Sequence, residues 1–336
     1  MSHRVVAAGW KPVSFMFLAA LIAAVVLVPA PLAAQTVNAV KAWTHPKTAD
    51  GVPDLQGVYS NATAVPLERA KNLGSKEFYT EQEMADRNKA AAAQAAARAA
   101  ADADPNTVHY DLRQFGLDRR VTAASNRTSQ IVGPEGVIPP LLPEGQARIA
   151  ARQAALRGHN FDDAQHRSLS ERCILWPNEG PPMLSPGYNS DLQVVQGPGY
   201  VAIMQEMIHD TRMIPTDGSP HLPQNIRLLM GDSRGHWEGN TLVIDTTNFT
   251  DRTAFRNSGE NLHVIERLTR TSDKTLLYQF TVEDPKTWAK PWSAEVTWEA
   301  INNPIYEYAC QEGNYGMANI LSGARAAEKE QANSGK

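Results

Sequence analysis

Histidine and carboxylate side chains concentrate in two short stretches of the chain, where they could transfer protons. The first stretch, 206–212, reads EMIHDTR, and the second, 231–251, reads GDSRGHWEGNTLVIDTTNFTD. A histidine that is oriented by a carboxylate can serve as a general acid or base, and a nearby cation can stabilise an oxyanion. The predicted catalytic residues are His209 with Asp210 or Glu206, His236 with Glu238, and Arg212 as the electrophilic group.

Aromatic side chains are frequent in the last third of the chain, and aromatic walls with a few polar groups are typical of small-molecule pockets. The residues that we predict to bind a ligand are Trp237, His263, Tyr278, Trp292, Trp298 and Tyr308. Two structural alternatives use the same kinds of residue. The aromatic residues could form an ordinary core, and the charged residues could form a buried Asp–Arg or Glu–Arg pair that holds strands in register.

The motifs give little support for a metal or a cofactor. The histidines of the second half, His209, His221, His236 and His263, are not spaced as HxH or HExxH, so we predict no metal site. The chain lacks the glycine-rich motifs that bind nucleotides and the GxSxG of α/β-hydrolases, so we predict no cofactor. The net charge of −4 gives no electrostatic reason for nucleic acid to bind.

The first 34 residues have the three parts of a secretory signal peptide. Basic residues precede the apolar run Phe15–Val28, and small residues end at Ala34, after which we predict cleavage. A retained membrane anchor is the alternative, because the run is close to the length that separates the two classes. The pattern predicts a periplasmic or secreted protein with no stable membrane insertion after cleavage.

The chain has two cysteines, Cys173 and Cys310. In an exported protein an even number of cysteines favours disulfide formation. We therefore predict a disulfide between them, which would connect the segment before the β-rich region to the end of that region. Two buried free thiols are the alternative, since cysteine is common in protein cores.

Short segments with β alternation, joined by tight turns, dominate the second half of the chain. The strands expected are Leu192–Gln196, Tyr200–Ile214, Ile226–Trp237, Thr241–Asn248, His263–Thr271, Thr275–Glu283, Trp292–Glu299 and Ile305–Cys310. Closure removes exposed sheet edges. The pattern therefore predicts a mainly β fold, an antiparallel meander that closes into a lipocalin-like barrel.

The rest of the chain is predicted to surround this barrel. We assign residues 173–321 to the barrel domain and residues 35–172 to an N-terminal extension with a short strand and two helices, Thr80–Ala103 and Glu144–Leu156. A capping box of Thr80 and Glu83 begins the first helix. Residues 322–336 are predicted to be a disordered tail.

Four stretches of the chain resemble a group of exported bacterial proteins of unassigned function. They are PDLQGVYSN at 53–61, GYVAIMQEMIHDTRMIP at 199–215, GDSRGHWEGNTLVIDTTNFTD at 231–251 and IYEYACQEGNYGMANIL at 305–321. The group shares wording close to PDLxGxW, EMIHDxR, SRGHWEGxTLVxDTTNF and YEYACxEGNYG. Gln311 stands where those proteins often carry histidine, which argues against an indispensable base or ligand at that position.

Together these patterns predict a periplasmic enzyme that needs no cofactor and performs acid–base chemistry on a small apolar or aromatic molecule. A lyase, isomerase or hydratase fits best, because such reactions need a placed histidine, a carboxylate and a group that stabilises an oxyanion. A non-catalytic, lipocalin-like carrier of a hydrophobic ligand is the main alternative. An envelope structural factor that uses the alanine-rich helix as a contact surface is the other.

Overall fold

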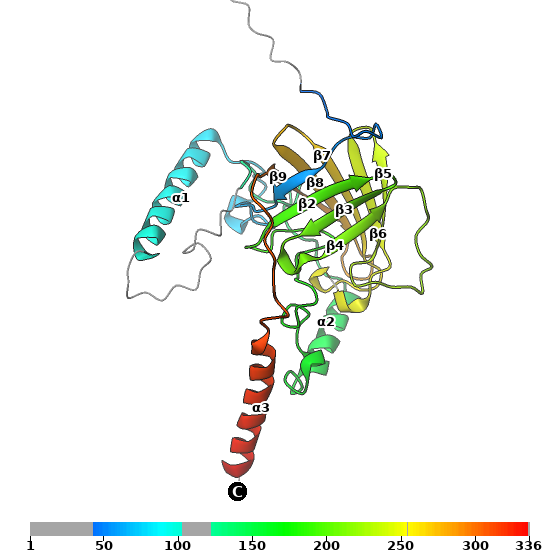
Figure 1. The fold of residues 1–336 in the computed structure, drawn as a ribbon. Helices are drawn as coiled ribbons and strands as arrows, with labels where there is room; N and C mark the ends of the chain where they lie inside the picture. The colour runs from blue at the N-terminus through cyan, green and yellow to red at the C-terminus, as the bar shows by residue number, and fades with distance from the viewer. Residues whose placement is uncertain (1–42, 103–121, 254, 335–336) are drawn as a thin grey trace, which may run out of the picture. The chain divides into compact units, whose positions relative to one another are not determined.

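A nine-stranded antiparallel sheet that curls into a nearly closed barrel forms the centre of the computed structural model (Figure 1). The structure describes residues 43–102, 122–253 and 255–334, so the predicted signal peptide lies outside the described residues. The strands are β1 (Gly57–Ser60), β2 (Asp191–Gly197), β3 (Tyr200–Gln205), β4 (Thr211–Pro215), β5 (Asp232–Glu238), β6 (Thr241–Thr247), β7 (His263–Arg270), β8 (Thr275–Glu283) and β9 (Trp292–Ala300). The predicted lipocalin-like barrel class is confirmed.

The sheet order is β4-β3-β2-β1-β9-β8-β7-β6-β5, and every neighbouring pair is antiparallel. An odd number of strands with alternating directions makes the first and last strands run the same way. β4 and β5 therefore meet as parallel neighbours where the barrel closes. We call this contact the seam.

Side chains hold the seam. Arg212 on β4 donates from Nη2 to Ser233 Oγ on β5, 3.0 Å away. A Cβ atom on Gly235 of β5 would lie only 3.0 Å from Ile214 Cγ2 and 2.9 Å from Thr216 Cγ2. Glycine at this position thus lets the two strands approach closely.

A buried polar network crosses the barrel interior from the seam. Arg212 makes two hydrogen bonds to the Glu266 carboxylate on β7, of 3.0 and 2.7 Å. Tyr278 on β8 donates to Glu266 Oε1 at 2.7 Å, and its hydroxyl accepts from the Met183 N–H at 2.8 Å. The buried Glu–Arg pair that the sequence left as an alternative is present, so the predicted electrophilic group Arg212 lies in the core.

Apolar side chains fill the rest of the interior. Alternate residues of β8 point inward, as the predicted apolar face requires, and Trp292 and Trp298 on β9 are buried beside them. The Tyr278 and Trp298 rings stack with centroids 4.8 Å apart. Three of the predicted ligand-binding residues, Tyr278, Trp292 and Trp298, therefore belong to a packed core.

One predicted strand is a hairpin. The expected strand Tyr200–Ile214 is wrong, because Ile208 and His209 adopt left-handed backbone conformations, with φ of 60° and 52°. They lie in the short 3-10 helix η4 (Met207–His209), which reverses the chain so that β3 and β4 pair. Arg212 consequently faces inward together with Ile203, its register partner, rather than with Met204.

Two other strand predictions differ from the structure. β5 begins at Asp232 rather than Ile226, since the preceding residues form turns that end at Gly231 with φ of 70°. Ile305–Cys310 forms no strand. Both free edges of the sheet, on β4 and β5, already face each other across the seam, so no edge is left for another strand.

Three helices accompany the barrel in the described part of the chain: α1 (Glu81–Asp102), α2 (Pro143–Leu156) and α3 (Tyr315–Ser334). The capping box is present, since Glu83 N–H donates to Thr80 Oγ1 and Thr80 N–H to the Glu83 carboxylate. The prediction of a disordered tail is wrong over 322–334, where residues with high helix propensity extend α3. Within the described residues, no helix is long and apolar enough to cross a membrane.

Two further features connect the N-terminal part and the C-terminal segment to the barrel. β1, predicted in the extension, lies between β2 and β9. The predicted disulfide is present: Cys173 and Cys310 are bonded, with Cα atoms 5.6 Å apart. Their sequence separation of 137 residues makes this a long-range constraint on the unfolded chain. Disulfides of this kind persist in oxidising compartments.

The buried pair makes a quantitative prediction. We expect Glu266→Ala to lower the free energy of unfolding by about 3–5 kcal/mol, because it leaves Arg212 charged and buried without its carboxylate. The double variant Arg212→Met/Glu266→Leu should lose less than that single variant, since it removes both charges. Urea denaturation followed by circular dichroism measures both. A double variant less stable than Glu266→Ala would contradict this account.

Candidate acid–base site

Histidines and carboxylates alternate in a row on the outer face of β5, β6, β7 and β8. The histidine–carboxylate row consists of Asp232, His221, Asp245, His263 and Glu283. Strand alternation explains why the row faces outward. Ser233 and Thr246 point into the barrel and hydrogen-bond each other at 3.0 Å, so their neighbours Asp232 and Asp245 point away from it.

The Asp245 carboxylate is the centre of the row. Its Oδ1 lies 2.9 Å from His221 Nε2, and its Oδ2 lies 2.8 Å from His263 Nε2. One carboxylate thereby orients two imidazole rings. The hydrogen bond from His263 lowers the pKa of Asp245, and the same bond raises the pKa of His263. This arrangement favours an ionised aspartate beside a protonated imidazole.

The two rings differ in their second contacts. His221 Nδ1 lies 2.9 Å from Asp232 Oδ2, and that oxygen also accepts from the Leu222 N–H at 2.8 Å. The second ring nitrogen of His263, Nδ1, lies 3.4 Å from Glu283 Oε2, the longest contact of the row. Glu283 is the register partner of His263 and its side chain is 40% exposed. Among the ring nitrogens of the row, Nδ1 of His263 can therefore most easily replace its carboxylate partner with another group.

The row is a chain of hydrogen bonds rather than a metal centre. Each ring nitrogen faces its own carboxylate oxygen, so the donor atoms do not converge on one point. Within the described ranges, no group of three or more histidine, cysteine, aspartate or glutamate side chains is placed to hold a metal ion.

The predicted catalytic histidines lie apart from each other. His209 is exposed in η4, and His236 is exposed on β5, with Nε2 3.1 Å from Glu238 Oε1. His209 precedes the start of β4, whereas His236 is next to Gly235, which lies close to Ile214 near the end of β4. Because β4 and β5 are parallel, the two histidines lie toward opposite ends of the seam. Glu238 also pairs with Arg267 at 2.7 Å on the surface.

Other predicted residues gather around a carboxyl group that the sequence did not indicate. Glu179, in the proline-rich loop before β2, is fully buried, and its Oε2 accepts from the Trp176 N–H at 2.7 Å. Its Oε1 is buried without a hydrogen-bond partner. Burial raises the pKa of Glu179 to about 8, against the lowering by the Trp176 bond, and Asp210 raises it further.

Asp210 and Tyr308 complete this Glu179 cluster. Burial raises the pKa of half-buried Asp210. The Tyr308 hydroxyl lies 3.3 Å from that of Tyr188, and burial, followed by that contact, raises its pKa. Glu206, which precedes Asp210 by four residues, is also buried, and its carboxylate accepts from the Tyr306 N–H at 3.4 Å.

The remaining predicted ligand-binding residues take separate places. Trp237 is half-buried and packs against the core. His263 is the one predicted ligand-binding residue that belongs to the row. Asp232 and Asp245 lie in the stretch 231–251, whose density of charged residues indicated a polar site. No spacing rule could have connected them to His221, which lies in the loop between β4 and β5.

Neither the protein-family models nor the curated proteins compared with this chain gave a match.

The Glu179 carboxyl should make stability depend on pH. The group ionises near its usual pKa of 4.5 in the unfolded chain and near 8 in the folded protein. The protonated group therefore makes its full contribution to the free energy of unfolding below pH 4.5, and this contribution is lost as the pH rises through 8. We expect the stability of Glu179→Gln relative to the wild type to be greater at pH 9 than at pH 5, because glutamine does not ionise. Urea titrations of both proteins at the two pH values measure this difference. The exposed variant Glu312→Gln should show no such trend, and a constant difference for Glu179→Gln would refute the buried acid.

The Asp245 contact should be visible in the titration of His263. We expect a native His263 pKa above 6.5 and a clear decrease in Asp245→Asn, which removes the charge that favours the imidazolium. Because the folded pKa is raised, this pair stabilises the fold fully below pH 6.5, and the gain is lost as the pH rises through the folded value. NMR titration of the imidazole C–H signals measures both proteins. Glu238→Gln, outside the row, should leave His263 unchanged.

Proposed function

We propose that the protein is an exported enzyme that transfers protons on a small molecule without a bound cofactor. The observation that carries the proposal is the Asp245 carboxylate between two imidazole rings, at 2.9 and 2.8 Å. A carboxylate that fixes the orientation of a ring and raises its basicity is the arrangement of a general base. The reaction class is that of lyases, isomerases or hydratases.

His263 is the proton-transferring residue in this proposal. Its Nε2 stays bonded to Asp245, while Nδ1 exchanges the long contact with Glu283 for the substrate. The protonated ring donates a proton from Nδ1 to the substrate. The neutral ring keeps its proton on Nε2 and accepts a proton from the substrate at Nδ1. The side chain is 29% exposed, so a substrate reaches it without displacing core residues.

The proposal moves the catalytic centre away from the residues first predicted. Arg212 is committed to Glu266 in the core, and His236 and Glu238 lie on the exposed hairpin of β5 and β6. The aromatic residues first predicted as a pocket wall are largely packed in the barrel, so they give no reason to prefer an aromatic substrate here. We propose instead a small molecule with an acidic C–H or O–H bond.

The carrier alternative has less support. A lipocalin-like carrier would hold its ligand inside the barrel, and that interior is occupied by the Arg212 network and the buried aromatic rings. The cysteine pairing supports export, because it suits a periplasmic or extracellular compartment. We also infer kinship with the exported bacterial group named above, whose shared motifs cover η4, β6 and most of β5 and include Asp245. Asp232 lies one residue before the motif that contains Asp245.

Proton exchange into carbon acids tests this function without knowledge of the natural reaction. The purified protein is incubated in deuterium oxide with a panel of small ketones and α,β-unsaturated acids, and deuterium incorporation is followed by NMR. We expect exchange into at least one compound to fall by about 10²–10⁴ in His263→Ala and in Asp245→Asn. The control His159→Ala removes an exposed histidine far outside the row in sequence. Exchange that His263→Ala leaves unchanged would refute the assignment.

A further inference from the structure

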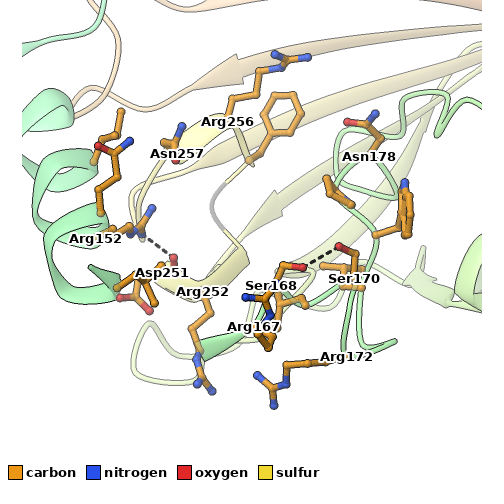
Figure 2. Close-up of a pocket in the computed structure, with 18 of the residues that line it drawn as sticks. Arg152, Arg167, Ser168, Ser170, Arg172, Asn178, Asp251, Arg252, Arg256 and Asn257 are labelled. Carbon is orange, nitrogen blue, oxygen red and sulfur yellow. Dashed lines mark hydrogen bonds between the residues drawn. The ribbon is translucent and has the colours of Figure 1, made fainter. Parts of the chain in front are cut away.

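A cleft of about 890 Å³ opens between three segments that are distant in the sequence. Figure 2 shows its lining residues, which come from α2, from the loop 165–181 and from the connection 251–257 between β6 and β7. The histidine–carboxylate row does not contribute to this lining. The cleft is therefore a separate place for chemistry or binding.

Positive charge dominates the cleft. Its lining includes five arginines, Arg152, Arg167, Arg172, Arg252 and Arg256, and a single carboxylate, Asp251. The whole chain carries a net charge of −4. The cleft is thus a local reversal of the protein's charge, and charges of one sign in a cleft concentrate ligands of the opposite sign.

Most of this charge is not neutralised by carboxylates. Arg167 pairs with Glu171, but Arg152 donates to two main-chain carbonyl groups, of Ser258 at 3.3 Å and Asp251 at 2.6 Å. Burial, followed by the neighbouring Arg148, lowers the pKa of Arg152, while the charge of Asp251 acts in the opposite direction. No ion pair of Arg172 or Arg252 is found among the described residues.

Apolar side chains form the rest of the wall. Leu169, Leu175, Trp176 and Phe255 line the cleft together with prolines of the loop. Phe255 is fixed there, because its ring stacks on Trp292 with centroids 6.1 Å apart. A volume of this size suits a small organic ligand, for which sites usually combine apolar walls with a few oriented polar groups.

We propose that this arginine cleft binds a small organic oxyanion with an apolar body. Guanidinium groups match the paired oxygens of carboxylates and phosphates and bind them through charge-assisted hydrogen bonds. Arg172 and Arg252 hold the anionic head, and the leucine and aromatic wall holds the body. The site does not depend on the proposed enzymatic reaction, since its lining is separate from the row and its readout is binding.

Calorimetric titration of the full chain with matched naphthalene ligands tests the head and the body separately. We expect saturable binding of 2-naphthoate or 2-naphthyl phosphate, and at least tenfold weaker binding of the uncharged 2-naphthamide and of inorganic phosphate. The tighter of the two then shows whether the cleft prefers a carboxylate or a phosphate head group. Binding should weaken as sodium chloride is raised, because the ligand charge is screened.

Variants assign the binding to the cleft. Arg172→Gln and Arg252→Gln should each weaken binding of the preferred ligand about tenfold, while Arg87→Gln, on the exposed surface of α1, should leave it unchanged. Circular dichroism checks that each variant is folded, and Arg252, which is exposed, is the variant least able to disturb folding. Absence of saturable binding, equal binding of 2-naphthamide, equal binding of inorganic phosphate, or indifference to both cleft variants would overturn the proposal.

Discussion

The bidentate bond between Arg212 and Glu266 is the interaction on which the barrel closure depends. Nine alternating strands leave β4 and β5 parallel at the ends of the hydrogen-bonded order. A sheet edge without a partner invites pairing with other chains. Arg212 joins this seam through Ser233 and is itself held by Glu266, which Tyr278 also contacts. Such a pair is costly to desolvate, so we expect its value to lie in specifying which strands meet rather than in net stability.

The inner network also determines what the outer face presents. Ser233, Thr246 and Glu266 point inward on three successive strands, and alternation then sends Asp232, Asp245 and His263 outward. A slip of one residue in any of these strands would exchange the two sets. Buried polar residues and surface proton-transfer groups are therefore two consequences of one register, which explains why both sets occupy the same short stretches of sequence.

Sequence reasoning succeeded where local pattern and structure coincide. The alternation in 275–283 and the turn after Glu238 gave β8 and the β5–β6 hairpin, and the cysteine count gave the disulfide. It failed at Ile208 and His209, because no pattern reveals left-handed backbone at a branched residue and a histidine. It also missed Glu179, and it named His221 without selecting it as a catalytic residue. Both lie in loops, where the partner of a side chain depends on tertiary packing.

The connection between β6 and β7 joins the two candidate sites. Asp245 precedes it and His263 follows it, while its middle supplies Arg252, Phe255 and Arg256 to the cleft. Main-chain carbonyls of this connection accept from Arg148 and Arg152 on α2, and Gly259 N–H donates to the buried Asp284 at 2.9 Å. These contacts fix both ends of the same short segment. The register of β6 with β7, in which Asp245 pairs with Ile265, sets the spacing of Asp245 and His263. A substitution such as Arg252→Gln in the connection is therefore expected to change the cleft and to leave that spacing in place.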